Sequence, residues 1–148
     1  MDAINFLRRK KMMKYSIVFV LVVVTSCAVQ KQKKEVHCPE IIPEDFYVRM
    51  ESNPDAIVLD TRIRSEYAEE RIPGARFAGK REALDELTDS LEKATPIFVY
   101  CEYEDRSSTV CRILKGEKEF RDVYLLKGGY DMWKKVNLPV DSSQRQVF

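Results

Sequence analysis

One cysteine in this chain stands where a reactive thiolate would be expected. Cys101 follows the apolar run "PIFVY", which is typical of a buried strand, and Arg106 and two serines come shortly after it, where a helix can begin. The N-terminus of a helix stabilises a thiolate through its dipole and its free backbone N–H groups. Three of the four residues between Cys101 and Arg106 are acidic, however, and negative charge disfavours a thiolate. The segment "CEYEDR" therefore contains either a working nucleophile or the remnant of one.

Other cysteine chemistries find less support in the sequence. The 148 residues include four cysteines and one histidine, His37, but no CxxC pair. A zinc site needs a cluster of Cys and His ligands, so zinc binding is not expected. A Cys–His catalytic pair is not expected either, because His37 lies in the polar segment ahead of the predicted domain. We predict that the protein uses no metal and no organic cofactor.

The N-terminal segment has the pattern of an export signal. "MKYSIVFVLVVVTSC" contains a lysine, an apolar run over 17–24 and small residues before Cys27. The run is shorter than the roughly 20 residues that cross a bilayer and has the length of a signal-peptide core. "VTSC" resembles a bacterial lipobox, whose cysteine is lipidated, so we expect an exported lipoprotein on the periplasmic or surface side of a membrane. A plain secretory signal and an apolar N-terminal helix are alternatives, and Met1 and Met13 are both candidate starts.

The length of the chain suits one domain with a leader. We predict a signal peptide over 1–27, a flexible tether over 28–39, an α/β domain over 40–141 and a tail over 142–148. The lysines of the tether could hold it near anionic headgroups. The net charge of +1 gives no broad basic field, so nucleic acid is not an expected partner.

Short strands and helices alternate along the predicted domain. The runs "AIVL", "PIFVY" and "VYLL" are apolar throughout, as strands that are covered on both faces are. Segments with helical patterns lie around them: "PEDFYVRMES", "RSEYAEER", "REALDELTDSLEK", "RSSTVCRILKGEKEF" and "YDMWKKVN". The alternation predicts a parallel sheet with helices on both faces and a site at the C-terminal ends of its strands. Asp60, Cys101 and the pair Gly128–Gly129 follow the three strands, so three loops could meet at one site.

Three motifs in this order resemble the rhodanese-like domain family. "IVLDTRIRSEYAEERIPGARF" is similar to the first signature of the family, "IFVYCEYEDRSSTVCRIL" to its active-site loop and helix, and "VYLLKGGYDMWKKVNLPV" to its closing segment. The similarity runs from about Ile41 to Val140 and implies a single domain with a five-stranded parallel sheet and helices on both faces. One departure is Arg71, where the family often has histidine before Ile-Pro-Gly, and this could change packing near the turn.

The resemblance implies a sulfurtransferase that uses Cys101. In active members the cysteine takes a sulfane sulfur from a small donor, holds it as a persulfide and passes it to a thiol or another acceptor, which is nucleophilic catalysis. Backbone N–H groups of the loop would cradle the anion, and Arg106 would close the loop. The remaining loop residues expected at the substrate are Glu102, Tyr103, Glu104, Asp105 and Ser107. Away from the loop, the resemblance suggests a structural charge cluster of Asp60, Arg62 and Glu66.

The acidic residues of the loop influence the expected substrate. If their side chains project into water, each charge acts on the thiolate with only about 1 kcal/mol at about 4 Å. Glu102, Glu104 and Asp105 together should still repel anionic donors such as thiosulfate. We therefore expect a neutral or cationic thiol, a polysulfide or a protein partner. Tyr103 at the loop tip is either a recognition surface or an exposed aromatic residue.

Loop length and the other cysteines define the alternatives. Related phosphatases place five residues between cysteine and arginine, whereas this loop has four, so phosphatase activity is disfavoured. A rhodanese fold kept for partner docking or persulfide sensing is a second candidate. A thiol redox protein that pairs Cys101 with Cys38 is a third. Cys111 is expected to be a buried core cysteine, with a resolving thiol for Cys101 as its alternative role, and Trp133 and Tyr130 are expected in the core or at its rim.

Overall fold

The computed structural model describes residues 36–103 and 105–143. The predicted signal peptide with Cys27, most of the predicted tether, Glu104 and the end of the predicted tail lie outside these residues. Within the described part of the chain, no helix is long and apolar enough to cross a membrane.

A five-stranded parallel sheet organises the domain. Its strands are β1 (Glu40–Ile41), β2 (Ile57–Asp60), β3 (Arg76–Phe77), β4 (Ile97–Tyr100) and β5 (Val123–Leu126), in the spatial order β1-β5-β4-β2-β3. The central strand β4 pairs in register with β2 from Ile97 opposite Ile57, and it pairs with β5 on its other side. The predicted fold class is confirmed. The three central strands are those that the apolar runs predict, whereas β1 was not recognised in the sequence.

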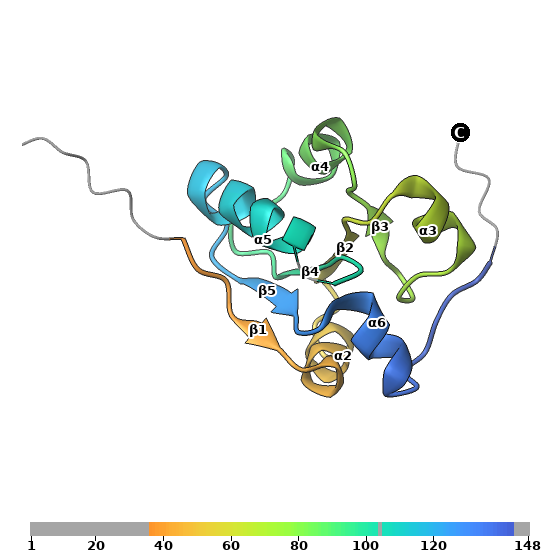
Figure 1. The fold of residues 1–148 in the computed structure, drawn as a ribbon. Helices are drawn as coiled ribbons and strands as arrows, with labels where there is room; N and C mark the ends of the chain where they lie inside the picture. The colour runs from red at the N-terminus through yellow and green to blue at the C-terminus, as the bar shows by residue number, and fades with distance from the viewer. Residues whose placement is uncertain (1–35, 104, 144–148) are drawn as a thin grey trace, which may run out of the picture. The chain divides into compact units, whose positions relative to one another are not determined.

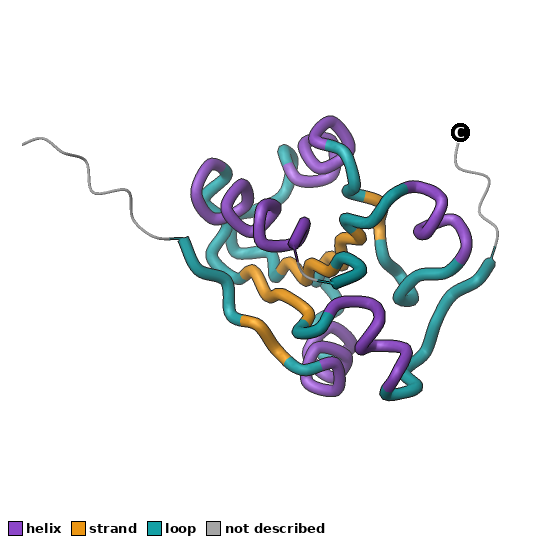
Figure 2. The backbone as a smooth tube through the Cα atoms, viewed as in Figure 1, coloured by secondary structure: helices purple, strands orange, loops and turns teal. Residues whose placement is uncertain are grey.

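Helices cover both faces of this sheet (Figures 1 and 2). They are α2 (Pro43–Glu51), α3 (Arg64–Glu69), α4 (Arg81–Thr88), α5 (Asp105–Arg112), the π-helical continuation η1 (Ile113–Glu117) and α6 (Gly129–Lys135). The apolar residues of α4, α5 and η1 form one core cluster with one face of the sheet. Those of α2 and α6 form a second cluster on the other face.

Side chains of β4 alternate between the two core clusters. Ile97 and Val99 belong to the cluster of α4 and α5, whereas Phe98 and Tyr100 belong to the cluster of α2 and α6. Because side chains of a strand alternate with a period of two, the next residue, Cys101, continues on the side of α5. This order places its thiol at the start of the helix that follows it.

Trp133 and Tyr130 are fully buried in the second cluster, which confirms their prediction as core residues. The indole N–H of Trp133 donates a hydrogen bond to the carbonyl of Pro139 at 2.9 Å. The ring of Tyr130 stacks on Tyr100, with 5.7 Å between centroids. These contacts fix α6 against β4 beneath the loop that carries Cys101.

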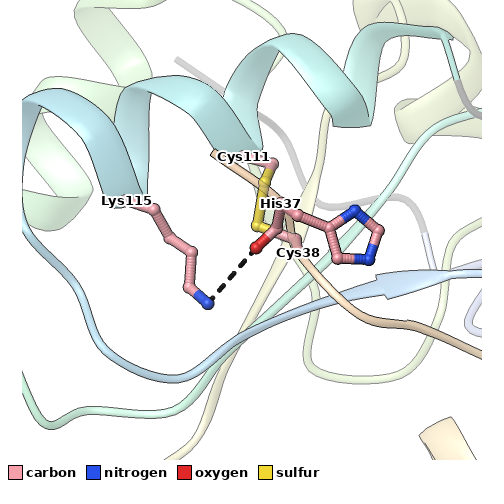
Figure 3. The surroundings of a disulfide bond; sticks show 4 residues. All are labelled: His37, Cys38, Cys111 and Lys115. Carbon is pink, nitrogen blue, oxygen red and sulfur yellow. Dashed lines mark hydrogen bonds between the residues drawn. A yellow bond between two sulfur atoms is a disulfide. The ribbon is translucent and has the colours of Figure 1, made fainter. Parts of the chain in front are cut away.

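Cys38 and Cys111 form a disulfide, so the prediction of Cys111 as a free core cysteine is wrong (Figure 3). The bond joins the segment ahead of β1 to the last turn of α5, across 73 positions of the sequence. His37 adds a contact to the same helix, because its carbonyl accepts a hydrogen bond from Lys115 at 3.5 Å. The pairing also excludes the predicted Cys38–Cys101 redox pair and a resolving role for Cys111 in the oxidised protein.

Candidate active site

Cys101 lies at the C-terminal end of β4, buried against the first turns of α5. It is 3% exposed and remains a thiol. Its Sγ lies 3.6 Å from the hydroxyl of Ser107, which is itself buried on α5. The thiol S–H donates to this hydroxyl, and the thiol lies at the positive end of α5. An anion formed on this sulfur would meet the N-terminus of α5 and a hydroxyl that can rotate to donate to it, and neither of these is a basic side chain.

Backbone contacts from α6 hold the loop from the opposite side. The N–H of Tyr130 donates to the carbonyl of Cys101 at 2.8 Å, and the N–H of Asp131 donates to that of Glu102 at 3.4 Å. This close approach requires glycine at position 129, because a Cβ atom there would lie 2.3 Å from the carbonyl oxygen of Glu102. Gly129 also has a φ of +63°, which glycine adopts without steric cost. The Gly-Gly pair after β5 therefore positions the loop of Cys101.

A buried arginine compensates the first acidic residue of the loop. Arg62, which is 2% exposed, makes a bidentate pair with Asp60 and a second ion pair with Glu102, at 2.8 Å and 3.3 Å respectively. Its guanidinium also lies 3.9 Å from the ring centroid of Tyr130. The side chain of Glu102 turns toward Arg62 and is 26% exposed, so it does not project fully into water. Arg62 thus offsets the charge of Glu102 in part, because its one positive charge is shared between two carboxylates.

Burial and charge shift the titration of this network. Burial alone would lower the pKa of Arg62, but hydrogen bonding to Asp60 and the charge of that carboxylate outweigh it and raise the pKa. Burial raises the pKa of Tyr100 well above its usual value, and the adjacent Asp60 carboxylate adds to the effect. The Tyr100 hydroxyl donates to Asp60 at 2.6 Å and accepts from the N–H of Ile72 at 3.2 Å. Arg62 is thus held as a cation and Tyr100 as a neutral phenol.

The other predicted loop residues lie at different depths. Tyr103 is 70% exposed at the loop tip, Asp105 is the exposed first residue of α5, and Glu104 is outside the described residues. Arg106 is also exposed, and its guanidinium makes no hydrogen bond to residues 36–103 or 105–143. The loop closure expected of Arg106 is therefore absent from the described contacts. Arg106 lines a groove between α4 and α5 instead.

Glu66 and Arg71 have local structural contacts. Glu66 accepts a hydrogen bond from the N–H of Ile63 at 3.1 Å at the start of α3, so it does not join the cluster of Asp60 and Arg62. Arg71 is buried and binds the carboxylate of Asp141 at 2.8 Å and the carbonyl of Ser143. Hydrogen bonds from Ser143, followed by the charge of Arg71, lower the pKa of Asp141 to about 2. Arg71, which stands where the family often has histidine, thus fastens the C-terminal segment to the domain.

Comparison with known proteins identifies the family. The model of the rhodanese-like domain matches residues 43–136, which is more than half of the chain. The chain therefore belongs to the rhodanese-like domain family.

Relatives of known name support a sulfurtransferase class. The chain is 34% identical over 80 residues to thiosulfate sulfurtransferase GlpE from Coxiella burnetii, covering 54% of this chain and 73% of that protein. It is 28% identical over 102 residues to the protein of the same name from Glaesserella parasuis, covering 69% and 92%. Among solved structures, the rhodanese-like domain of the Alr3790 protein from Anabaena superposes with a TM-score of 0.61 at 30% identity, covering 72% of this chain and 81% of that one.

Proposed function

We propose that this protein is a sulfurtransferase that carries sulfane sulfur as a persulfide on Cys101. The observation that carries the proposal is the buried thiol of Cys101, 3.6 Å from the Ser107 hydroxyl at the start of α5. The names of the relatives from Coxiella burnetii and Glaesserella parasuis support the same chemistry. The ion pair of Glu102 with Arg62 supports it further, because it compensates one of the charges that oppose a thiolate.

Two displacement steps make up the proposed reaction. In the first, the Cys101 thiolate attacks the outer sulfur of the donor, and with thiosulfate the donor S–S bond breaks as sulfite leaves with the electron pair. In the second, an acceptor thiolate attacks the outer sulfur of the persulfide, and the electron pair of the broken bond returns to Cys101. The sulfane sulfur moves without net oxidation, so no cofactor is needed. Ser107 stabilises the anionic sulfur of Cys101 at the start and at the end of this cycle.

Steady-state sulfur transfer by the purified full-length protein tests this proposal. We expect turnover with thiosulfate or polysulfide as the donor and a thiol as the acceptor, and none after Cys101→Ser. Ser107→Ala should lower the rate by about tenfold, because a hydrogen bond to a charged group contributes roughly 1.5 kcal/mol or more. Ser90→Ala, an exposed serine after α4, serves as the matched control. A folded protein without turnover from either donor would instead support a docking or persulfide-sensing module.

We also propose that the protein is exported and anchored through a lipid on Cys27. The lipobox-like segment "VTSC" supports this, and so does the Cys38–Cys111 disulfide, because disulfides persist mainly in oxidising compartments. Cys38 precedes β1, whereas Cys101 follows β4, so the two lie at opposite ends of the parallel strands. Metabolic labelling with an alkyne fatty acid should mark the wild type and not Cys27→Ala, and a labelled variant would contradict the anchor.

A further inference from the structure

A groove between α4 and α5 opens on the same side of the sheet as Cys101. It has a volume of about 340 Å³, within the range of small-molecule sites. Thr61 and Arg106 line it. The hydroxyl of Thr61 donates to the carbonyl of Tyr100 at 2.8 Å, one residue before Cys101, and Arg106 adjoins Ser107, which contacts the thiol. The groove therefore borders the catalytic loop at two points.

The lining of this groove combines an apolar floor with a cationic rim. Leu84 and Val110, both buried, contribute to the floor. Three cations lie on the rim, but Arg81 is already engaged by Asp85 at 2.8 Å and Glu117 at 2.9 Å.

The two remaining cations of the rim are Lys80 and Arg106. Neither makes a side-chain hydrogen bond or ion pair with the described part of the chain. Among the residues that the structure describes, Asp105 is the one acidic residue that lines the groove. The uncompensated charge is therefore positive, and a carboxylate is the complementary ligand group.

We infer that this groove binds the acceptor of the proposed reaction, a small thiol that carries a carboxylate. The inference rests on the proposed function and specifies its substrate class. The aliphatic part of the thiol would lie over the apolar floor, with its carboxylate at Lys80 and Arg106. Its thiolate would attack the outer sulfur on Cys101 and leave as a persulfide, and Cys101 would return to the thiolate. This acceptor preference is opposite to the one that the acidic loop suggests, because Lys80 and Arg106 of the groove, and not the tip of the loop, would face the carboxylate.

Discharge of the loaded full-length protein tests the inference. The protein is first treated with polysulfide, freed of excess donor and checked for a persulfide on Cys101. It is then mixed with 3-mercaptopropionate, 2-mercaptoethanol or cysteamine at equal thiolate concentrations. Each rate is divided by the rate of that thiol with a small disulfide in solution, which removes intrinsic nucleophilicity. The three thiols are similar in size and differ in charge, so the normalised rates report the charge preference of the site.

The anionic thiol should discharge Cys101 about fivefold faster than neutral 2-mercaptoethanol, the effect of one unit charge at about 4 Å in water, and the cationic thiol should be slower still. Lys80→Gln should reduce this ratio, whereas Lys93→Gln, the same change on the loop ahead of β4, should leave it unaltered. If the ratio of the normalised discharge rates is the same in the wild type and in Lys80→Gln, the groove is not the acceptor site. The proposal of sulfur transfer by Cys101 would not be affected by that result. Failure to load Cys101 at all would overturn the proposed function, and the acceptor site with it.

Discussion

Reduction of the Cys38–Cys111 disulfide should lower the stability of the domain by a predictable amount. The bond closes a loop of 73 residues. A cross-link of this span restricts the unfolded chain and contributes about 4 kcal/mol to the free energy of unfolding in the chain-entropy description. The bond also fastens the segment directly ahead of β1, an edge strand of two residues, to α5. We therefore expect urea unfolding to shift by about 2 M on reduction, with a slope of roughly 2 kcal/mol per M.

The double variant Cys38→Ser/Cys111→Ser separates the disulfide from other effects of the reductant. Its unfolding midpoint should match that of the reduced wild type and should not respond to reductant. Cys101→Ser should keep the full response, because Cys101 takes no part in the bond. An oxidised wild type that unfolds at the same urea concentration with and without reductant would refute this reasoning.

Three further predictions concern the charges around the site and the C-terminal segment. Arg62→Met should lower the free energy of unfolding in urea by about 3–5 kcal/mol, because it leaves the buried Asp60 carboxylate uncompensated. A loss below about 1 kcal/mol would argue against the ion-pair network of Arg62. The pKa of Tyr100 is raised in the fold, so this residue stabilises the protein fully at pH values below its unfolded pKa of 10.0. The free energy of unfolding, followed by tryptophan fluorescence, should therefore fall as the pH rises above 10.0. A free energy of unfolding that does not change with pH in this range would be inconsistent with the raised pKa. Asp141, whose pKa is lowered from 3.8 to about 2, stabilises the fold above pH 3.8. The stability difference between wild type and Asp141→Asn should therefore shrink as the pH falls through that interval, and a full difference that persists at pH 2 would count against the lowered pKa that Ser143 and Arg71 produce.

Local sequence patterns predict the centre of this fold better than its edges. The apolar runs of β2, β4 and β5 are buried on both faces, and such strands stand out in a sequence. They are also enough to place Cys101 at the C-terminal end of the central strand. The edge strand β1 has two residues, Glu40 and Ile41, and pairs with β5 far along the chain. A segment of two residues is too short to show an alternation of apolar and polar side chains. Its pairing with β5 is therefore visible only in the structure.

Contacts between distant positions account for the features that the sequence did not reveal. Arg62 and Glu102 are 40 positions apart, and only the parallel pairing of β2 with β4 brings the ends of these strands together. The same holds for Cys38 and Cys111, whose pairing depends on how the segment before β1 lies against α5. The acidity of the loop is therefore an incomplete guide to the environment of the thiol, because the compensating charge comes from another strand.

The most direct test of the account is the mass of the full-length protein after treatment with a sulfur donor. Thiosulfate and polysulfide are applied separately, and the intact mass and the modified peptide are then determined under non-reducing conditions. We expect the gain of one sulfur atom on Cys101, removed by a thiol, with Cys38 and Cys111 still joined. A folded protein that gains no sulfur on Cys101 from either donor would contradict the central claim.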